Sequence, residues 1–410
     1  MIRVARYLFL LFILTLPYYL FGSGGIQIST IFLILSFIVG LAHCLLYVSE
    51  RKRLTEIFAK NRHLIMFFFL AATINMIYTF VMRDSSLLMP NLYLIFNFIA
   101  VVLFFIVGAD KRLLRSMKTC FRINIVLQLA IYFLGFGRDY SLDRYMGTFN
   151  DPNQFSFFIL ISLIFMYVIG VVTTPSKSDI LFWGIGVVLV LLAASTGILL
   201  GMGVFLALLA ALNYRKILLW VQFIVIFIFA AVGVLMLPLG PQKSTGSTHN
   251  EMLFFERISS KFDSIDAESD RTIFEDRVID RVFYYPQYLL FGSGDGAHER
   301  FPKQYLYGLE IHSTPIALLF YYGIIPFLFI VYWVWRMVRN ADIRIKIALI
   351  AILHESITLL NYRQPLMWML VAFSSVAAQA VERNNLRTIL NSKFFISRQR
   401  KYRLALGGRK

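Results

Sequence analysis

Cysteine is scarce in this chain. Only Cys44 and Cys120 occur among 410 residues, inside or beside apolar stretches. They form no CxxC pair and cannot build the disulfide framework of a small secreted domain. We therefore expect both to be inert packing residues.

Motifs for metals and nucleotides are also missing. The six histidines include no HxxxH or HExxH spacing. No Walker sequence is present, and the glycine-rich stretch 292–297 follows no predicted strand, which favours a tight external turn over a dinucleotide site. The acidic stretch 266–270 resembles the start of a calcium loop but lacks its glycine and distal glutamate, which favours a solvated acidic face. We expect neither a metal nor a cofactor.

Hydrophobic residues are what the chain has in excess. They make up 59% of it, whereas soluble domains have about 45–50% even with glycine counted. A membrane-spanning helix needs about 20 apolar residues, so roughly twelve helices would account for this excess. The composition predicts an all-α integral membrane protein with about 12 transmembrane helices. It excludes a soluble enzyme, a disordered scaffold and a receptor with a single anchor.

Apolar runs separated by charged residues predict the positions of the spans. Arg3 and Arg6 precede the first run as they would in a signal peptide, but many spans follow, so we interpret it as a retained first helix. The predicted spans are 7–22, 26–48, 64–82, 91–108, 121–137, 154–172, 180–194, 197–212, 217–238, 312–335, 343–360 and 364–381.

Charge decides whether the apolar stretch 180–212 is one helix or two bent near Ser195. With two helices, one side of the membrane holds 28 of the 40 Lys and Arg and 6 of the 23 acids, which leaves 12 and 16 for the other side and Glu355 inside a span. With one helix, the basic tail 382–410 would lie outside, against the positive-inside rule. We therefore predict twelve spans with both termini cytoplasmic. The basic residues then attract anionic membrane lipid, and nucleic acid is excluded as a partner.

This topology divides the chain into four parts. Residues 1–239 hold spans 1–9, residues 240–311 form one long external loop, residues 312–381 hold spans 10–12, and residues 382–410 form a basic cytoplasmic tail. The loop carries 12 acids and 8 bases in its 72 residues. Apolar residues at helical spacing indicate that it is partly helical.

Three outward segments bring arginine to one membrane face. The loop contributes Arg271, Arg277 and Arg281, which lie on or near the side opposite an apolar helical face within 271–290. The segment 137–153 contributes Arg144, and its Asn153 could cap the next helix. The short connection 361–365 contributes Arg363. The plain alternative is that these arginines are surface charges or partners of the abundant acids.

Two histidines are candidates for chemistry. His312 lies where the long loop re-enters the membrane, on the same predicted face as the arginines. A neutral imidazole beside several guanidinium groups can accept a proton while they hold an anion, although an interfacial histidine is more often a residue that starts a helix. His354 and Glu355 lie inside the eleventh span, where ionisable groups are costly and usually line a cavity. A hydrogen-bonded structural pair is the alternative for them.

The outward motifs resemble those of the O-antigen polymerase and O-antigen ligase family, multi-pass bacterial enzymes of surface polysaccharide assembly. Residues 144–155 (RYMGTFNDPNQF) are similar to its G-T-F-x-x-P-N-x-F motif. Arg271, Pro286 and the sequence FGSG at 291–294 are similar to its R…P…(F/L)-G-x-G segment. His312, followed by Gly323, is similar to its H-N…G motif. Ser313 replaces the asparagine of that motif, and the bend 195–197 (STG) lacks the arginine of the family's Ser-Arg-Gly.

The resemblance implies a chemistry and partners. A glycan passes from an undecaprenyl diphosphate carrier to a hydroxyl of a growing polysaccharide on the outer face of the bacterial cytoplasmic membrane. Arg271, with Arg144 and Arg277, would stabilise the leaving diphosphate. His312 would orient or deprotonate the acceptor, with Glu310 and the His354–Glu355 pair as alternative bases. A flippase and a chain-length regulator are implied partners.

Other functions remain open at this point. A ligase that transfers the glycan to a lipid or protein acceptor shares these features, and the wording GTFNDPNQ favours a polymerase only by association with capsule and exopolysaccharide clusters. A flippase, which is a transporter, would have charges spread through many spans, whereas here they gather outside. A structural scaffold would leave the motifs unexplained.

Overall fold

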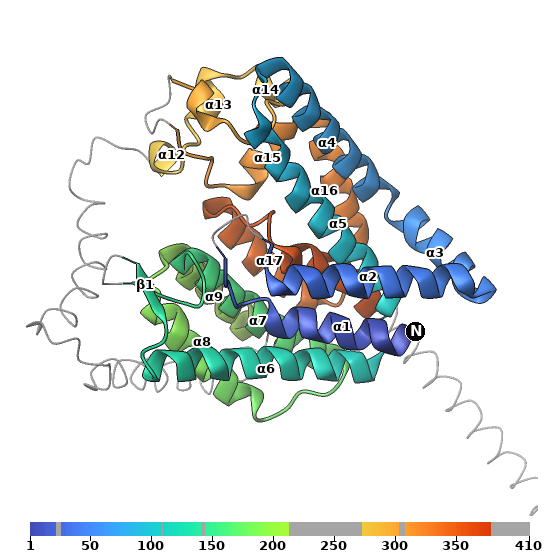
Figure 1. Ribbon diagram of the computed structural model, residues 1–410. Coiled ribbons are helices and arrows are strands. Elements are labelled where there is room, and N and C mark those ends of the chain that lie inside the picture. The colour runs from blue at the N-terminus through green and yellow to red at the C-terminus, as the bar shows by residue number, and fades with distance from the viewer. Residues whose placement is uncertain (22–25, 109, 141–143, 213–272, 303–307, 379–410) are drawn as a thin grey trace, which may run out of the picture.

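The computed structural model describes residues 1–21, 26–108, 110–140, 144–212, 273–302 and 308–378. Helices dominate this part of the chain (Figure 1). The predicted ninth span, the acidic stretch 266–270, Arg271 and the basic tail lie outside the described residues.

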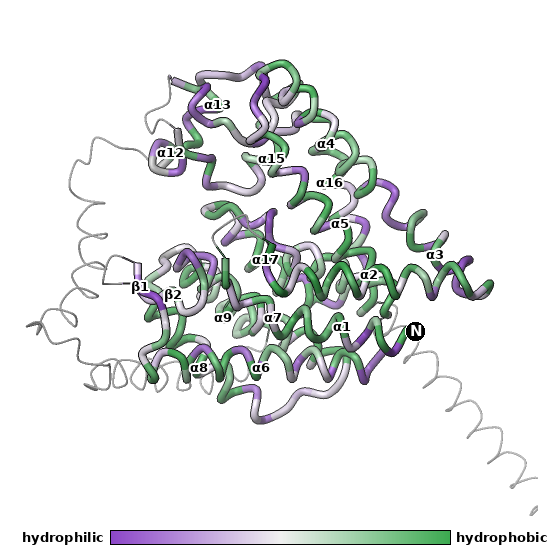
Figure 2. Tube along the Cα trace, in the orientation of Figure 1, coloured by the Kyte–Doolittle hydropathy of each residue, from purple (hydrophilic) through white to green (hydrophobic). Residues whose placement is uncertain are grey.

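The first half of the chain forms nine helices, and all but the charged α3, which lies in the predicted connection 49–63, follow the apolar runs. Most of these helices are rich in hydrophobic residues, whereas the segments around β1 and α13 are more hydrophilic (Figure 2). The helices are α1 (Ile2–Thr15), α2 (Ile28–Leu46), α3 (Val48–Lys60), α4 (Arg62–Met82), α5 (Met89–Val107), α6 (Lys111–Phe133), α7 (Pro152–Val172), α8 (Asp179–Leu192) and α9 (Thr196–Leu212).

The described part of the second half starts at residue 273 with three one-turn helices, which longer helices follow. A final apolar helix covers Pro365–Ala378. The labelled helices are α12 (Ile273–Asp276), α13 (Arg281–Tyr284), α14 (Tyr288–Phe291), α15 (Thr314–Tyr322), α16 (Ile324–Val338) and α17 (Ile343–Thr358).

Four described segments are long and apolar enough to cross a membrane. They are Ile28–Leu46, Arg62–Met82, Ser85–Val107 and Pro152–Val172, with four shorter apolar helices beside them. This confirms the prediction of a mainly helical protein with membrane-spanning helices in its coarse form. The number of twelve spans and the sidedness of the connections stay predictions.

The stretch 180–212 is two helices, as the charge distribution predicted. α8 ends at Leu192 and α9 begins at Thr196. Ala194 between them has a positive φ of 49°, a conformation that breaks a right-handed helix.

The predicted span 312–335 differs from expectation, because it is two helices. α15 ends and α16 begins at Gly323, whose φ is 75°. An added Cβ at Gly323 would lie 2.6 Å from the carbonyl oxygen of Leu290. Hydropathy could not reveal this break, since it depends on the close approach of α14.

A short hairpin also departs from the all-helical expectation. β1 (Arg138–Tyr140) pairs antiparallel with β2 (Arg144–Gly147) just before α7. Tyr145 of β2 is buried, with its ring against Tyr132 and Phe155. The hairpin thus fixes the segment that enters α7.

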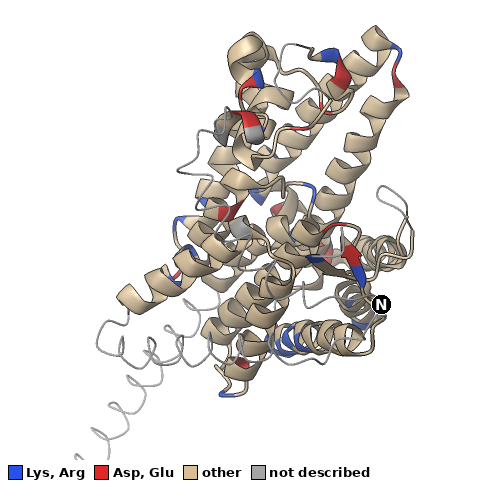
Figure 3. Ribbon diagram, turned by 90° about the vertical axis from the view of Figure 1, so that its left-hand side faces the viewer, with Lys and Arg blue, Asp and Glu red and all other residues tan. Residues whose placement is uncertain are grey.

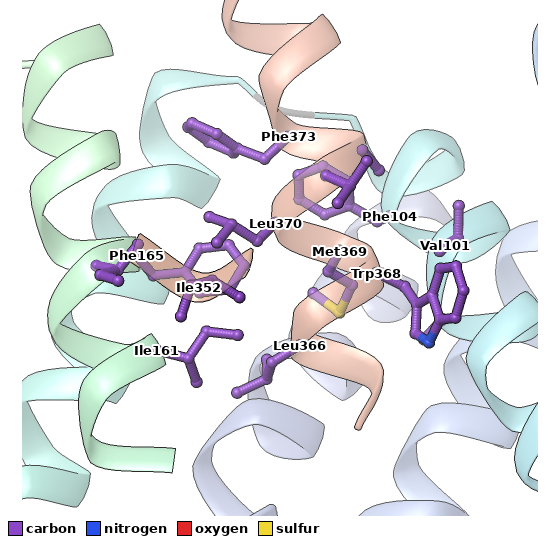
Figure 4. Close-up of a cluster of buried hydrophobic side chains, with 14 of the residues drawn as sticks. Val101, Phe104, Ile161, Phe165, Ile352, Leu366, Trp368, Met369, Leu370 and Phe373 are labelled. Atoms are coloured by element: carbon purple, nitrogen blue, oxygen red, sulfur yellow. The ribbon is translucent and has the colours of Figure 1, made fainter. Parts of the chain in front are cut away.

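α7 lies at the centre of the bundle. Nearly all of its residues are buried, and it contacts α6, α8, α9 and α17. In Figure 4, Ile161 and Phe165 of α7 face Leu366 and Leu370 of the last helix across a dry apolar cluster. Trp368 lies beside Val101 of α5 (Figure 4), and the Phe373 ring lies 6.3 Å from the rings of both Phe104 in α5 and Phe165 in α7. This core holds the connections at each end of the bundle in place.

The connections gather at two ends of the bundle. In Figure 1, β1 and α12 lie toward one end, and the N-terminus and α3 toward the other. At the second end the Arg6 guanidinium binds Asp110 at 2.6 Å, and Arg53 donates to the carbonyl of Phe105.

Candidate functional site

The glycine-rich stretch 292–297 is a turn that enters the helix bundle. Gly292, Gly294 and Gly296 all have positive φ, which residues with a Cβ rarely adopt. The backbone N–H of Gly294 donates to the carbonyl of Tyr321 in α15. The hydroxyl of Tyr78 in α4 donates to the carbonyl of Gly292. The turn is therefore tied to two helices that are far apart in sequence.

Asp295, at the tip of this turn, has no exposed surface. Its backbone N–H donates to the side-chain oxygen of Asn75 in α4 at 2.9 Å. Asn75 lies seven residues before the end of α4, or about 10 Å along the helix axis at 1.5 Å per residue. Irregular backbone at such a depth needs protein hydrogen-bond partners, and Asn75 supplies one.

The connection 361–363 meets the turn from the opposite side. The hydroxyl of Tyr362 donates to the Asp295 carboxylate, and Nη2 of Arg363 donates to it at 3.0 Å. The carbonyl of Tyr362 accepts from Nδ2 of Asn97 in α5 at 2.8 Å and from Nε1 of Trp368 at 2.6 Å. Asp295 is thus a buried carboxylate that joins two outward segments predicted independently.

Arg363 bridges this buried carboxylate to a more exposed one. Its Nη1 lies 2.8 Å from Oε2 of Glu310, whose side chain is 31% exposed, against 0% for Asp295. The guanidinium is held by aromatic faces as well, since Tyr93 and Tyr362 lie beneath it. One arginine therefore links an enclosed anion to an anion at the edge.

His298 lies between Arg281 and Glu310 and links these two residues. Nη1 of Arg281 lies 3.2 Å from Nδ1 of His298, and Nε2 of His298 lies 3.9 Å from Oε2 of Glu310. Because a guanidinium can only donate, we assign Nδ1 as acceptor and the proton to Nε2. Burial lowers the pKa of His298 to about 4, and the charge of Arg281 adds to this effect while Asp295 opposes it. His298 is therefore neutral at physiological pH.

The cluster formed by Asp295, Arg363, Glu310 and His298 has His312 at its margin. His312 is half-buried and lies just before α15. Its backbone N–H donates to the carbonyl of Arg277 at 2.9 Å. Burial lowers the pKa of His312. Arg277 and Arg363 lower it further, whereas Glu310 and Asp151 act in the opposite direction. The predicted cause, nearby arginines, contributes, but burial is the larger cause.

The influence of Asp151 on His312 also relates the hairpin segment to this cluster. Asp151 is the N-cap of α7, where its carboxylate accepts from the backbone N–H groups of Asn153 and Gln154. The prediction that Asn153 caps this helix is wrong. The helix begins two residues earlier than that prediction required, because Pro152 occupies its first turn.

Asn153 instead holds Arg144 and the α8–α9 break together. Its side-chain oxygen accepts from Nη2 of Arg144 at 3.0 Å and from the hydroxyl of Ser195 at 3.0 Å. Nε of Arg144 donates to the carbonyl of Ala193. This is where the resembling family often has an arginine within the bend, and here the arginine of β2 reaches the bend from outside.

The remaining predicted residues lie in different surroundings. Arg281 has no exposed surface; it stacks on Phe301 and donates to the carbonyl of Leu309. Glu355 in α17 is fully buried, and Nδ2 of Asn361 donates to it. His354 is half-buried and donates to or accepts from no described residue at Nδ1. Glu355 therefore touches the outward cluster only through the 361–363 connection.

Several members of the cluster were not predicted from the sequence. They are buried or half-buried and lie at positions that local patterns treat as ordinary: Asn75, Asp295, His298, Arg300 and Tyr362. The available signals were weak. One was a carboxylate among three glycines, and another was an asparagine inside a predicted span. Asp295 was hidden because the turn around it was interpreted as an exposed loop.

Within the described ranges, no three His, Cys, Asp or Glu side chains lie together as a metal site would require. What the geometry offers is a set of guanidinium groups with a half-buried imidazole and a half-exposed carboxylate at one edge. Such a set suits an anion and proton transfer. The chain matches no protein-family model, and no curated protein is similar to it in sequence.

Proposed function

We propose that this protein is a polysaccharide polymerase of the bacterial cytoplasmic membrane. It would transfer undecaprenyl-diphosphate-linked glycan units to a hydroxyl of the growing polysaccharide on the outer face. The observation that carries the proposal is that the backbone N–H of His312 donates to the carbonyl of Arg277, while the charges of Arg277, Arg363 and Asp151 act on its imidazole. Asp151 and His312 belong to two of the motifs that carry the family resemblance, Arg277 lies in the long loop between them, and Arg363 comes from the connection 361–365.

In the proposed reaction, the acceptor oxygen attacks the anomeric carbon of the donor glycan. The bond from that carbon to the diphosphate oxygen breaks, and its electron pair leaves with the diphosphate. His312 takes the acceptor proton, because its low pKa keeps the imidazole neutral and able to accept. Arginines stabilise the charge that develops on the leaving group.

Arg277 and Arg363 are the described arginines nearest to this reaction, and Arg271 is the further candidate. Arg144 has a second role in this proposal, because its contacts with Asn153 and Ala193 hold the 151–153 segment near His312. Such a residue positions the site and does not touch the diphosphate.

The experiment compares polymer in a strain that lacks the protein and is complemented with variants. The strain itself should retain single repeat units on the acceptor or on the carrier at the outer face. His312→Ala should reduce polymer by at least about 100-fold, the usual size of general-base assistance. His63→Gln at the opposite end of the bundle is the matched control and should leave polymer near normal.

Three results would contradict parts of the proposal. Long polymer in the uncomplemented strain would exclude a polymerase. Repeat units trapped at the inner face would indicate a flippase. Polymer retained on the carrier but missing from its final acceptor would indicate a ligase. If His312→Gln restores most polymer, His312 orients the acceptor and another group is the base.

Topology is tested separately by labelling. Twelve spans with cytoplasmic termini require that a cysteine placed at Ser247 reacts with an impermeant reagent from outside. A cysteine placed at Ser397 should react only after the membrane is opened. The reverse pattern would put the His312 cluster on the cytoplasmic side and exclude a lipid-linked donor at the outer face.

A further inference from the structure

The two carboxylates on Arg363 differ in a way that a purely structural bridge does not require. Asp295 is enclosed and also holds Tyr362, so it cannot move without opening the turn 292–297. Glu310 lies in an irregular connection, and nearly a third of its side chain is exposed. The contact with Asp295 is therefore enclosed by protein, whereas the contact with Glu310 is open to solvent.

Two guanidinium donors of this site lack an acceptor among the described residues. Nε of Arg363 and Nε of Arg300 are both buried and find no acceptor among the described residues. Another nitrogen of Arg300, Nη2, does have an acceptor, because it donates to the carbonyl of Gly294. A buried N–H without an acceptor is costly. An added anion with several oxygens would supply acceptors that the protein alone lacks.

From these observations we infer that Glu310 occupies the place of a diphosphate on Arg363, and that a bound diphosphate displaces it. This rests on the proposed function for the identity of the anion as part of a lipid-linked donor. Binding would move one nitrogen of Arg363 from a carboxylate to a phosphate oxygen, with no bond made or broken covalently. Asp295 keeps the guanidinium in place during the exchange.

The exchange has a consequence for the acceptor. Glu310 is two residues from His312, and its charge already acts on that imidazole. Once released from Arg363, the carboxylate loses the guanidinium that lies 2.8 Å from it. It then stabilises a protonated His312 more strongly, which favours transfer of the acceptor proton to the imidazole. The donor would thus prepare the base before the acceptor reacts.

The test measures binding of inorganic pyrophosphate to the purified full-length protein in detergent. Glu310→Gln keeps the shape of the side chain but removes the competing charge, and it should bind pyrophosphate at least about fivefold more tightly. Arg363→Gln should bind it much more weakly. Glu299→Gln is the matched control, because Glu299 is an exposed acid in the same loop without a described contact to Arg363. It should change binding less than about twofold.

Each outcome decides the inference. Unchanged or weaker binding in Glu310→Gln would overturn it, and so would an equal gain in Glu299→Gln, which would mean a general charge effect. Farnesyl diphosphate should compete with pyrophosphate if the site accepts a lipid diphosphate. If it does not compete, the anion is a free phosphate and the inference for the donor fails. Thermal unfolding of each variant verifies that it is folded.

Failure of the function and failure of the inference give different results. If Glu310→Gln binds pyrophosphate more tightly but the strain lacking the protein still makes long polymer, the exchange stands and the polymerase is excluded. If polymer is lost in that strain but Glu310→Gln does not gain affinity, the polymerase stands and Glu310 is only a structural partner of Arg363.

Discussion

Both ends of the helix bundle contain ion pairs between acidic and basic residues, but the pairs differ in how far they are buried. At the end with the N-terminus, Asp110 pairs with Arg6 at 2.6 Å, yet 42% of the aspartate side chain stays exposed. Even the most enclosed pair there, Lys118 with Asp179, leaves 18% of the aspartate exposed. At the other end, Asp295 is fully enclosed against Arg363. Figure 3 shows the molecule from the side of β1 and α12, where acidic residues lie among basic ones.

This difference indicates at which end of the bundle ion pairs fix the arrangement of the surrounding residues. Exposed pairs are worth little, because water and salt compete with them. Their surplus of basic charge can act on lipid headgroups. A buried pair is costly to form, and it becomes strongly destabilising when one partner is removed. The N-terminal end is therefore tolerant of change, and the Asp295 end is held in one arrangement.

The largest expected effect comes from breaking the enclosed pair. Asp295→Asn should destabilise the protein by about 3–5 kcal/mol, because Arg363 and Tyr362 lose a buried anion. Asp342→Asn, at the end with the N-terminus, should cost less than about 1 kcal/mol, since its pair with Arg344 is exposed. Chemical denaturation in detergent measures both. Equal losses would remove the distinction between the two ends.

A pH titration sharpens the comparison. The pKa of His298 is about 4 in the folded protein, below the usual value near 6.5. The unfolded chain therefore binds more protons between these values, and stability should fall by up to about 3 kcal/mol as pH decreases from about 6.5 to 4. His298→Gln should flatten this part of the stability curve. An unchanged curve would assign the acid sensitivity to other groups.

Two glycines provide a matched pair with a smaller effect. Gly292 has a φ of 78°, and an added Cβ would lie 2.7 Å from the carbonyl oxygen of Tyr321. Gly292→Ala should destabilise by about 2 kcal/mol or more, because both strain and a backbone clash oppose it. A Cβ at Gly203 in α9 meets nothing within 4 Å. Gly203→Ala should be neutral or stabilise by up to about 1 kcal/mol, and a loss there would contradict the described packing.

The smallest effect is expected at the exposed end. Arg344 donates to Asp342 two residues away, and its side chain is nearly half exposed. Arg344→Ala should cost less than about 0.5 kcal/mol, and added salt should abolish the difference. A cost that persists in high salt would show that this end is as tightly determined as the Asp295 end.

The sequence predicted only some of the residues of the candidate site. His312, Arg277 and Arg363 were singled out from the sequence, and the structure brings both arginines near enough to act on the pKa of His312. Their partners could not be found the same way. Glu310 and Asp295 look like two of the twelve acids in a long loop, and nothing local distinguishes an exposed acid from an enclosed one.

Helix caps and breaks show the same limit. Asp151 and Asn153 are both good capping residues, and only the path of the chain out of β2 decides between them. The α8–α9 break was predicted from charge. The break at Gly323 was not, because it depends on α14 packing against the start of α16.

The sequence by itself determined the class of protein and the positions of most apolar helices. These follow from composition and from local hydropathy, since each helix must bury its apolar side chains and satisfy its own backbone. Only the tertiary structure decided the environment of Asp295. Its burial depends on Asn75, Tyr362 and Arg363, which lie 220, 67 and 68 residues away along the chain. A charge takes its properties from the groups that surround it in space, and local patterns contain no record of them.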